Sequence, residues 1–198
     1  MYEDRYIVLA LYLAQGDEQL AKAAIDALFT AYQPATPTTL NSGKQARGEL
    51  VSCFKLSMDD TMNSIAKNIG YCLELSRLGG GVGVNLTDLR PLGDPIKHID
   101  NRASGVMPVA KLLENSFSYS NQLGQRNGSG VVYLNIFHRD IENFISSKKP
   151  NADEKIRLAT LSTGVVIPSV FFELMKRYED SALFSPYDIY REYGKRMS

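Results

Sequence analysis

The spacing of apolar residues changes period along the chain, and each change marks a new structural element. Residues 6–14 are mostly apolar and favour a helix. After Gly16, apolar residues return at helical spacing and predict a second helix over residues 17–31, which Asp17 can cap at its N-terminus. Residues 34–48 contain two prolines, two glycines and three threonines, so we expect an ordered loop there.

From residue 51 onward, short apolar runs alternate with longer segments of helical period. The runs predict strands over residues 51–56, 81–86, 131–136 and 165–167. The helix after the first strand ends at Gly79 and has an apolar stripe made of Met62, Ile65, Ala66, Ile69 and Leu73. A helix that opens at Pro108 is expected to turn inward Val109, Leu112, Leu113 and Phe117. Further helices are predicted at 140–146, through 171–175, and after a capping box formed by Ser185, Pro186 and Asp188.

Strands that alternate with helices predict βαβ units and a parallel sheet. Four strands are too few to close a barrel, so the sequence predicts an α/β fold with a partial barrel. We divide the chain into a helical lead-in segment over residues 1–33 and the partial barrel over residues 34–198. The chain starts inside one helical pattern and stops just after another, which we interpret as a piece of a longer protein.

Composition excludes several classes of function. Acidic and basic residues are equal at 22 each, and zero net charge argues against a general affinity for nucleic acid or anionic lipid. No apolar run approaches the roughly 20 residues that a membrane span needs, and the N-terminus lacks the pattern of a secretory signal. Two cysteines are too few for a disulfide scaffold, so we expect a reducing cytoplasm. The two histidines are far apart, without the spacing of zinc ligands.

Cys53 is the main candidate for chemistry. It lies beside Ser52 in a run that predicts a buried strand, after a Thr-Pro turn at Thr36 and one helix before a glycine-rich stretch at 79–83. A hydroxyl and a thiol at a strand end are typical of the place where a pocket opens. A buried strand cysteine is as often a small hydrophobic residue without a chemical role. On the residues alone, both interpretations stay open.

The other candidate residues carry weaker signals. Cys72 lies in the middle of a predicted helix and is expected to be an inert packing residue. Gly81 and Gly83 would let a ligand lie against the strand backbone, although a helix end that runs into a glycine-rich strand also explains them. Thr36 could bind a phosphate or only cap its own backbone. A Cys53–Cys72 disulfide is disfavoured, because a strand and a packed helix lie about 10 Å apart while bridged Cα atoms need less than roughly 7 Å.

Six segments together resemble one known family. They cover residues 34–54, 78–85, 89–97, 114–124, 151–157 and 182–188, and they closely resemble the large (alpha) subunit of class I ribonucleotide reductases, the class Ib branch in particular. The likeness runs from about Glu3 to Tyr190, with the motifs in family order and spacing. It implies the first half of a ten-stranded α/β barrel that holds a nucleoside diphosphate, with parallel strands alternating with helices.

The resemblance also implies roles for individual residues. Thr36, Ser52 and Gly81 match substrate-binding positions, and Cys53 matches a reducing cysteine of the substrate pocket. In the chemistry so implied, a thiyl radical takes the ribose 3′ hydrogen, the 2′ hydroxyl leaves as water and Cys53 delivers a hydrogen atom to C2′. Cys53 then forms a disulfide with a distant cysteine. Water exclusion from the pocket would protect such a step.

A second set of residues matches the allosteric site of the family. Asp60, Thr61, Met62, Arg90 and Lys97 match positions that line this site, where a deoxynucleoside triphosphate or ATP selects the substrate. The loop over residues 122–130, which includes Gln122 and Arg126, would relay that selection. Without the resemblance, Arg90 and Lys97 would be interpreted as solvated surface residues.

The resemblance further implies partners, and it has gaps. The chain would bind no cofactor itself, because a metal-containing small (beta) subunit supplies the radical and a thioredoxin- or glutaredoxin-like donor supplies electrons. An alpha homodimer, a complementing C-terminal fragment or both are expected. The thiyl cysteine, its Asn-x-Cys-x-Glu motif, the redox partner of Cys53 and the C-terminal shuttle cysteines are absent from the sequence.

Three functions therefore remain open. The first is a fragment of a ribonucleoside-diphosphate reductase alpha subunit, which is inactive until the missing part is supplied. The second is a non-catalytic module that binds only the effector nucleotide. The third is an unrelated α/β phosphosugar enzyme that uses Thr36 and Gly81, although no acid–base pair accompanies them in the sequence. We also expect the isolated half barrel to aggregate, because its last strand would have an unpaired edge.

Overall fold

The computed structural model describes residues 2–43, 49–120 and 129–198. The chain separates into two compact units, Met1–Ser52 and Cys53–Ser198, and each unit is described by itself. The boundary between them lies after residue 52, whereas the sequence suggested a boundary after residue 33. The division into a lead-in segment and a barrel remains a prediction.

The first unit is built from three helices: α1 (Tyr2–Ala14), α2 (Glu18–Thr30) and α3 (Thr36–Asn41). Asp17 caps α2 as predicted, because its carboxylate accepts hydrogen bonds from the backbone N–H groups of Gln19 at 2.9 Å and Leu20 at 3.0 Å. The prediction of a loop after Pro34 is wrong over 36–41. There a proline in the first turn starts α3, because a proline at this position needs no helical hydrogen bond.

The second unit contains one parallel sheet of four strands: β1 (Cys53–Ser57), β2 (Gly81–Asn85), β3 (Ser129–Asn135) and β4 (Ser162–Val166). The strands lie in chain order, β1-β2-β3-β4, and every neighbouring pair is parallel. This confirms the predicted α/β fold with parallel strands. Sequential order is the order of a barrel wall, whereas a doubly wound sheet reverses direction at a switch point.

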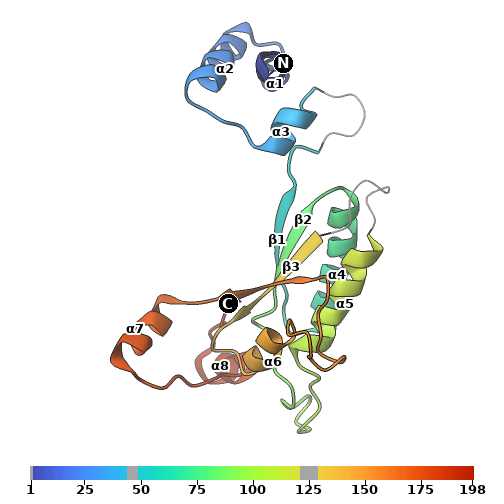
Figure 1. Cartoon of the computed structure of the whole chain (residues 1–198), viewed down its shortest axis with the longest axis vertical. Coiled ribbons are helices and arrows are strands. Elements are labelled where there is room, and N and C mark those ends of the chain that lie inside the picture. The colour runs from blue at the N-terminus through green and yellow to red at the C-terminus, as the bar shows by residue number, and fades with distance from the viewer. Residues whose placement is uncertain (1, 44–48, 121–128) are drawn as a thin grey trace. The chain divides into compact units, whose positions relative to one another are not determined.

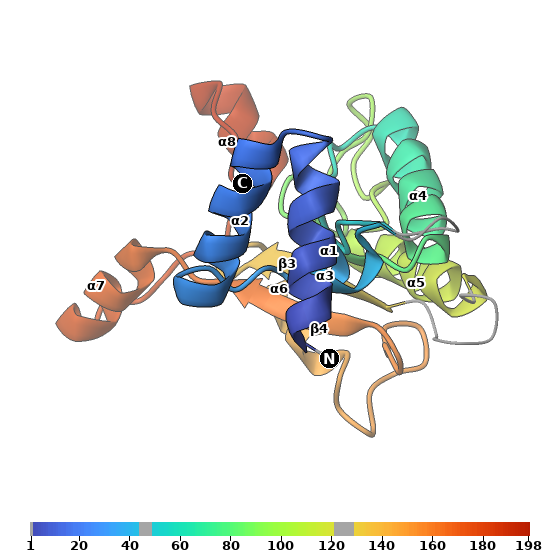
Figure 2. The same ribbon diagram turned by 90° about the horizontal axis from the view of Figure 1, so that it is seen from above.

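Helices connect the strands and cover one face of the sheet. They are α4 (Met62–Arg77), α5 (Val106–Tyr119) and α6 (Ile141–Ser146), followed after β4 by α7 (Ser169–Arg177) and α8 (Pro186–Tyr193). Figure 1 shows α4 and α5 side by side next to the strands, and Figure 2 shows them from above on the same side. The core lies between the sheet and these helices, where Val84, Val132, Leu134 and Leu113 are fully buried.

The helical faces differ in detail from the predicted ones. Leu112 was expected to point inward but is 51% exposed, and Met62 was expected in the apolar stripe of α4 but is 79% exposed. The buried face of α5 instead includes Val106, Met107 and Ala110, because this helix begins two residues before Pro108. The end of α4 is as predicted, since Gly79 follows its last residues with φ +96°.

Candidate functional site

The face of the sheet opposite the helices carries Cys53. Along β1, Phe54 and Leu56 pack against the core, so the alternation of a strand turns Cys53 and Lys55 to the other face. The strand was predicted to be buried, but Cys53 is exposed. This difference follows from the half-open sheet, whose second face has no helix layer among the described residues of this unit. The thiol therefore points away from the helices.

The strand register brings Cys53 beside the glycines of β2. Cys53 pairs with Gly81 and Lys55 pairs with Gly83, while on the other side of β2 Gly83 pairs with Val131 of β3. A cavity of about 490 Å³ follows these rows; it is lined by Cys53, Phe54, Lys55, Gly81, Val82, Gly83, Ser129, Gly130, Val131 and Tyr133. Cys53 and Gly81, which the sequence singled out separately, thus line one cavity.

The remaining predicted substrate-binding residues belong to the first unit. Thr36 is the first residue of α3, and Ser52 is the last residue of that unit. Because the two units are described separately, substrate-binding roles for Thr36 and Ser52 remain predictions. Cys72 is fully buried in the core, and its burial raises the pKa of the thiol to about 12. Cys53 and Cys72 are not joined in a disulfide.

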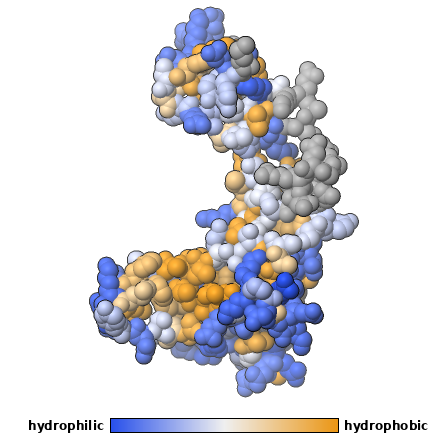
Figure 3. All heavy atoms as spheres, in the orientation of Figure 1, coloured by the Kyte–Doolittle hydropathy of each residue, from blue (hydrophilic) through white to orange (hydrophobic). Residues whose placement is uncertain are grey.

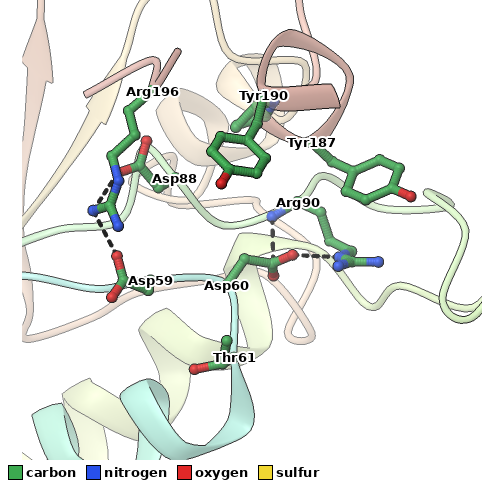
Figure 4. Close-up of a pocket in the computed structure, with 9 residues that line it drawn as sticks. Asp59, Asp60, Thr61, Asp88, Arg90, Tyr187, Tyr190 and Arg196 are labelled. Carbon is green, nitrogen blue, oxygen red and sulfur yellow. Dashed lines mark hydrogen bonds and ion pairs between the residues drawn. The ribbon is translucent and has the colours of Figure 1, made fainter. Parts of the chain in front are cut away.

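A second cavity of about 370 Å³ lies around an ion pair between Asp60 and Arg90 (Figure 4). Asp60 ends the turn between β1 and α4, and its carboxylate accepts hydrogen bonds from the Arg90 guanidinium and from the Arg90 backbone N–H, the latter at 3.3 Å. The guanidinium also donates to the carbonyl of Pro95. It lies 4.8 Å from the centre of the Tyr187 ring, within the range of a cation–π contact.

The other wall of this cavity comes from the C-terminal part of the chain. Arg196 contacts Asp59 at 2.7 Å and Asp88 at 3.8 Å, and Figure 4 shows it across the cavity from Arg90. Tyr187 and Tyr190 of α8 lie above Asp59 and Asp60 in the same view. The cavity thus combines carboxylates, guanidinium groups and aromatic rings, which can bind a nucleotide through its phosphates and its base.

The predicted effector residues are only partly brought together. Asp60, Thr61 and Arg90 line the second cavity, whereas Met62 and Lys97 are not among its lining residues. Lys97 lies at an exposed turn between Ile96 and Ile99, with φ +51°. Gln122 and Arg126 lie outside the described residues. Effector binding by all of these residues remains a prediction.

Three consecutive residues between β3 and α6 fix the loop that carries Arg90. His138 Nε2 lies 2.8 Å from the carbonyl of Leu89, and its Nδ1 accepts from the Asp140 backbone N–H at 3.0 Å, so Nε2 carries the proton. The Asp140 carboxylate accepts from the N–H groups of Leu92 and Val106, both at 3.0 Å. Arg139 contacts the buried Asp94 at 2.7 Å. Burial lowers the pKa of His138, so the ring is neutral near pH 7.

Sequence reasoning missed several residues of both cavities. Lys55 and Tyr133 could have been found from strand alternation and a parallel register, once β1 and β3 were aligned. Asp88 and Arg196 are 108 positions apart, and no local pattern links residues at that distance.

No group of three or more His, Cys, Asp or Glu residues with the geometry of a metal site occurs among the described residues. Within the same residues, no helix has both the length and the apolarity to span a membrane.

Comparison with known proteins identifies the family. Residues 51–198 match the family model for the barrel domain of ribonucleotide reductase. The chain is 52% identical over 198 residues to the ribonucleoside-diphosphate reductase subunit alpha of Mycoplasma pneumoniae, and 50% identical over 197 residues to that of Bacillus subtilis. It covers 28% of the length of each of these relatives. A Chlamydia pneumoniae subunit alpha is 36% identical over 158 residues, which are 80% of this chain and 15% of that protein. The chain therefore belongs to the ribonucleotide reductase family and carries part of its barrel domain.

Proposed function

We propose that this chain is part of the alpha subunit of a ribonucleoside-diphosphate reductase, in which Cys53 is a reducing thiol. The observation that carries the proposal is the position of Cys53 on the open face of a parallel sheet, next to Gly81 and in a shared cavity. A substrate that lies on the glycine backbone of β2 would have its sugar within reach of the neighbouring thiol. Membership of the family supports the same assignment.

The proposed reaction converts a ribonucleoside diphosphate into its 2′-deoxy form. A thiyl radical from another part of the protein removes the 3′ hydrogen, and the 2′ hydroxyl leaves as water. Cys53 supplies a hydrogen atom to C2′, and a second cysteine outside this sequence supplies the other reducing equivalent. The two sulfurs form a disulfide, and the first cysteine returns the hydrogen to C3′ and becomes a thiyl radical again. One substrate and two thiols thus give one deoxynucleotide, one water and one disulfide.

The proposal includes partners that the chain does not contain. A small subunit with a metal centre supplies the radical, and a thioredoxin- or glutaredoxin-like protein reduces the disulfide. The rest of the barrel, either in the same polypeptide or in a complementing one, supplies the thiyl cysteine and the partner of Cys53. A disulfide that must be re-reduced requires a reducing compartment, so we place the chain in the cytoplasm.

Reconstitution tests this proposal. The chain is combined with a polypeptide covering the missing part of a relative and with the small subunit, and deoxynucleotide formation is measured. We expect product with the unsubstituted chain and none with Cys53→Ala, while Cys72→Ala should retain activity if it folds. Absence of product beside an active full-length relative would argue against catalysis by this chain.

A second candidate function is a nucleotide-binding module without catalysis. It is favoured by the cavity around Asp60 and Arg90, which is lined entirely by residues of the second unit. Calorimetric titration with deoxynucleoside triphosphates and ATP tests it. We expect binding by the unsubstituted chain and a loss of at least roughly tenfold in affinity for Arg90→Ala, because a phosphate contact of a guanidinium group is charge-assisted. No binding at millimolar nucleotide would exclude this candidate.

A further inference from the structure

The cavity that contains Cys53 also contains an aromatic side chain with no place in the core. Tyr133 of β3 is 37% exposed, while its neighbours Val132 and Leu134 are fully buried on the helix side of the sheet. Tyr133 is therefore on the open face with Cys53. Many residues around it on that face are small, namely Gly81, Gly83, Ser129, Ser162 and Gly164, while Val131 and Lys55 are the larger side chains there.

Two glycines allow the Tyr133 ring to lie against the sheet. A Cβ atom added at Gly164 would lie 2.5 Å from Cε1 of the ring, and one added at Gly83 would lie 3.3 Å from Cε2. The first distance is impossible without a shift and the second is tight, so the ring occupies space that side chains on β2 and β4 would otherwise fill. The position of the ring is thus set by the sheet itself, not by packing in the core.

The hydroxyl group of Tyr133 is available for a hydrogen bond with a ligand. Among the described residues of the 53–198 unit, none forms a hydrogen bond with the Tyr133 hydroxyl. A large aromatic ring that is held against a glycine floor, beside a cavity and half open to solvent, is typical of a surface on which a planar ligand stacks.

We infer that Tyr133 contacts the nucleobase of the bound nucleotide and fixes its distance from Cys53. This inference rests on the proposed function, since it gives the cavity a nucleoside diphosphate as ligand. Cys53 lies at one end of the cavity, and Tyr133 lies two strands across from it and four residues further along. The spacings of a parallel sheet then put the Cα atoms of Cys53 and Tyr133 about 16 Å apart. The ring extends back toward Gly83, which leaves a space of nucleoside size between the thiol and the ring.

Calorimetric titration of the chain, reconstituted with the complementing polypeptide, with ADP, GDP, CDP, UDP and pyrophosphate tests the inference. We expect Tyr133→Ala to weaken nucleoside diphosphate binding roughly tenfold or more, because base–aromatic stacking is of that size. Tyr133→Phe keeps the ring and should bind as the unsubstituted chain does. Gly164→Ala keeps the tyrosine but displaces its ring, so it should weaken binding as Tyr133→Ala does. Pyrophosphate has no base, and its binding should not change.

The control is Tyr119→Ala, which removes an 84% exposed tyrosine from α5 and should leave binding unchanged. Circular dichroism shows which variants are folded, and Gly164→Ala carries the test if Tyr133→Ala is not. Unchanged nucleotide affinity in the folded variants would overturn the inference and leave the proposed function standing. An equal loss of pyrophosphate affinity would overturn the base contact. If the unsubstituted reconstituted complex binds no nucleoside diphosphate, the proposed function fails and the inference fails with it.

Discussion

At the scale of single residues, the two cysteines have opposite environments. Cys53 is exposed on the open face of the sheet, whereas Cys72 is fully buried on α4. A thiolate is the reactive form of cysteine, and burial disfavours it. The same residue type is therefore available for chemistry at one position and inert at the other, which the sequence indicated for Cys72 but left open for Cys53.

We predict that iodoacetamide alkylates Cys53 near pH 8 while Cys72 stays unmodified in the folded chain. The reason is both the exposure of Cys53 and the pKa of about 12 of the Cys72 thiol. Peptide mass mapping of the two sites measures this. Denaturant should make both react, which serves as the control. Equal labelling of the two cysteines in the folded chain would contradict the buried position of Cys72.

Glu114 gives a prediction about stability. The residue is 7% exposed, and its carboxylate accepts hydrogen bonds from the N–H groups of Thr160 at 2.7 Å and Leu161 at 3.2 Å. Burial alone would raise the pKa of Glu114, but these hydrogen bonds outweigh it, so the pKa is lowered. Glu114→Ala should reduce the free energy of unfolding by about 1–3 kcal/mol, because two backbone N–H groups, one of them buried, lose their acceptor.

Urea denaturation near pH 7 measures this effect. The control is Glu74→Ala, which removes an exposed ion pair with Arg77 and should cost less than about 1 kcal/mol. Because the pKa of Glu114 is lowered on folding, its stabilisation is present above the ordinary pKa of a glutamate and is lost as the pH falls below it. Equal effects of the two substitutions would contradict a special role for Glu114.

At the scale of elements, the connection between β3 and α6 organises the start of α5. Asp140 accepts a hydrogen bond from Val106, the first residue of α5, so it acts as a cap from a distant part of the chain. Asp140→Ala should destabilise the second unit by about 1–3 kcal/mol. Its control is Glu142→Ala at an exposed position of α6. Hydrogen exchange should show faster exchange at the N-terminus of α5 in Asp140→Ala, and unchanged exchange would contradict the capping role.

His138 makes this junction sensitive to acid. Burial is the largest cause of its lowered pKa, and it outweighs the opposite effects of the Leu89 carbonyl, Asp140 and Asp94; Arg139 also lowers it. The unfolded chain therefore binds the proton more readily than the folded one. Stability should fall as the pH drops below about 6.5, the ordinary pKa of histidine. Unfolding free energies measured between pH 7 and pH 5 check this, and His138→Phe, if folded, should have a flatter profile.

The elements themselves were largely predictable from the sequence. All four strands and the three helices between them were expected, because their apolar periods are long enough to separate strand from helix. The helix α3 was missed, since Pro37 and its threonines are typical of loops, yet a proline is also favourable in a first helical turn. The error at Leu112 arose because the helix was started at Pro108, whereas Val106 is its first residue.

At the scale of the whole chain, the second unit has surfaces that are normally covered. Among the described residues of this unit, no strand pairs with the outer edge of β4. Exposed apolar residues lie at the end of β4 and in the segment after it; these are Val166, Ile167, Val170, Phe172 and Met175. Figure 3 shows a broad hydrophobic area over this region of β4 and α7. Such an edge is a template for association with other chains.

We predict that the isolated chain associates at micromolar concentration, and that Val166→Lys reduces this association because a charge blocks pairing at the edge. Sedimentation velocity measures the size of the particles. Leu112→Lys is the matched control, since Leu112 is also exposed but lies on α5, and it should leave association unchanged. A monomeric chain with a sharp, reversible melting transition would contradict the prediction.

Long-range contacts set the limit of what the sequence could predict about the sites. Cys53 and Gly81 were identified from local patterns, whereas Asp60 and Arg90 were identified only because their segments resemble the family. Tyr133 could be placed only after β1 and β3 were aligned in a parallel register. The contact between Asp88 and Arg196 depends on the return of the chain after α8, which leaves no local pattern. Chemistry was thus predictable where a single element carries it, and not where folding brings elements together.

The central claim is that Cys53 gives up its hydrogen during the reduction of a ribonucleotide. The most direct measurement is the redox state of Cys53 after a single turnover of the reconstituted complex, without external reductant and with rapid alkylation of free thiols. We predict that Cys53 is found in a disulfide with a cysteine of the complementing polypeptide, in an amount equal to the deoxynucleotide formed. Deoxynucleotide formation with Cys53 still recovered as a free, alkylated thiol would contradict the account.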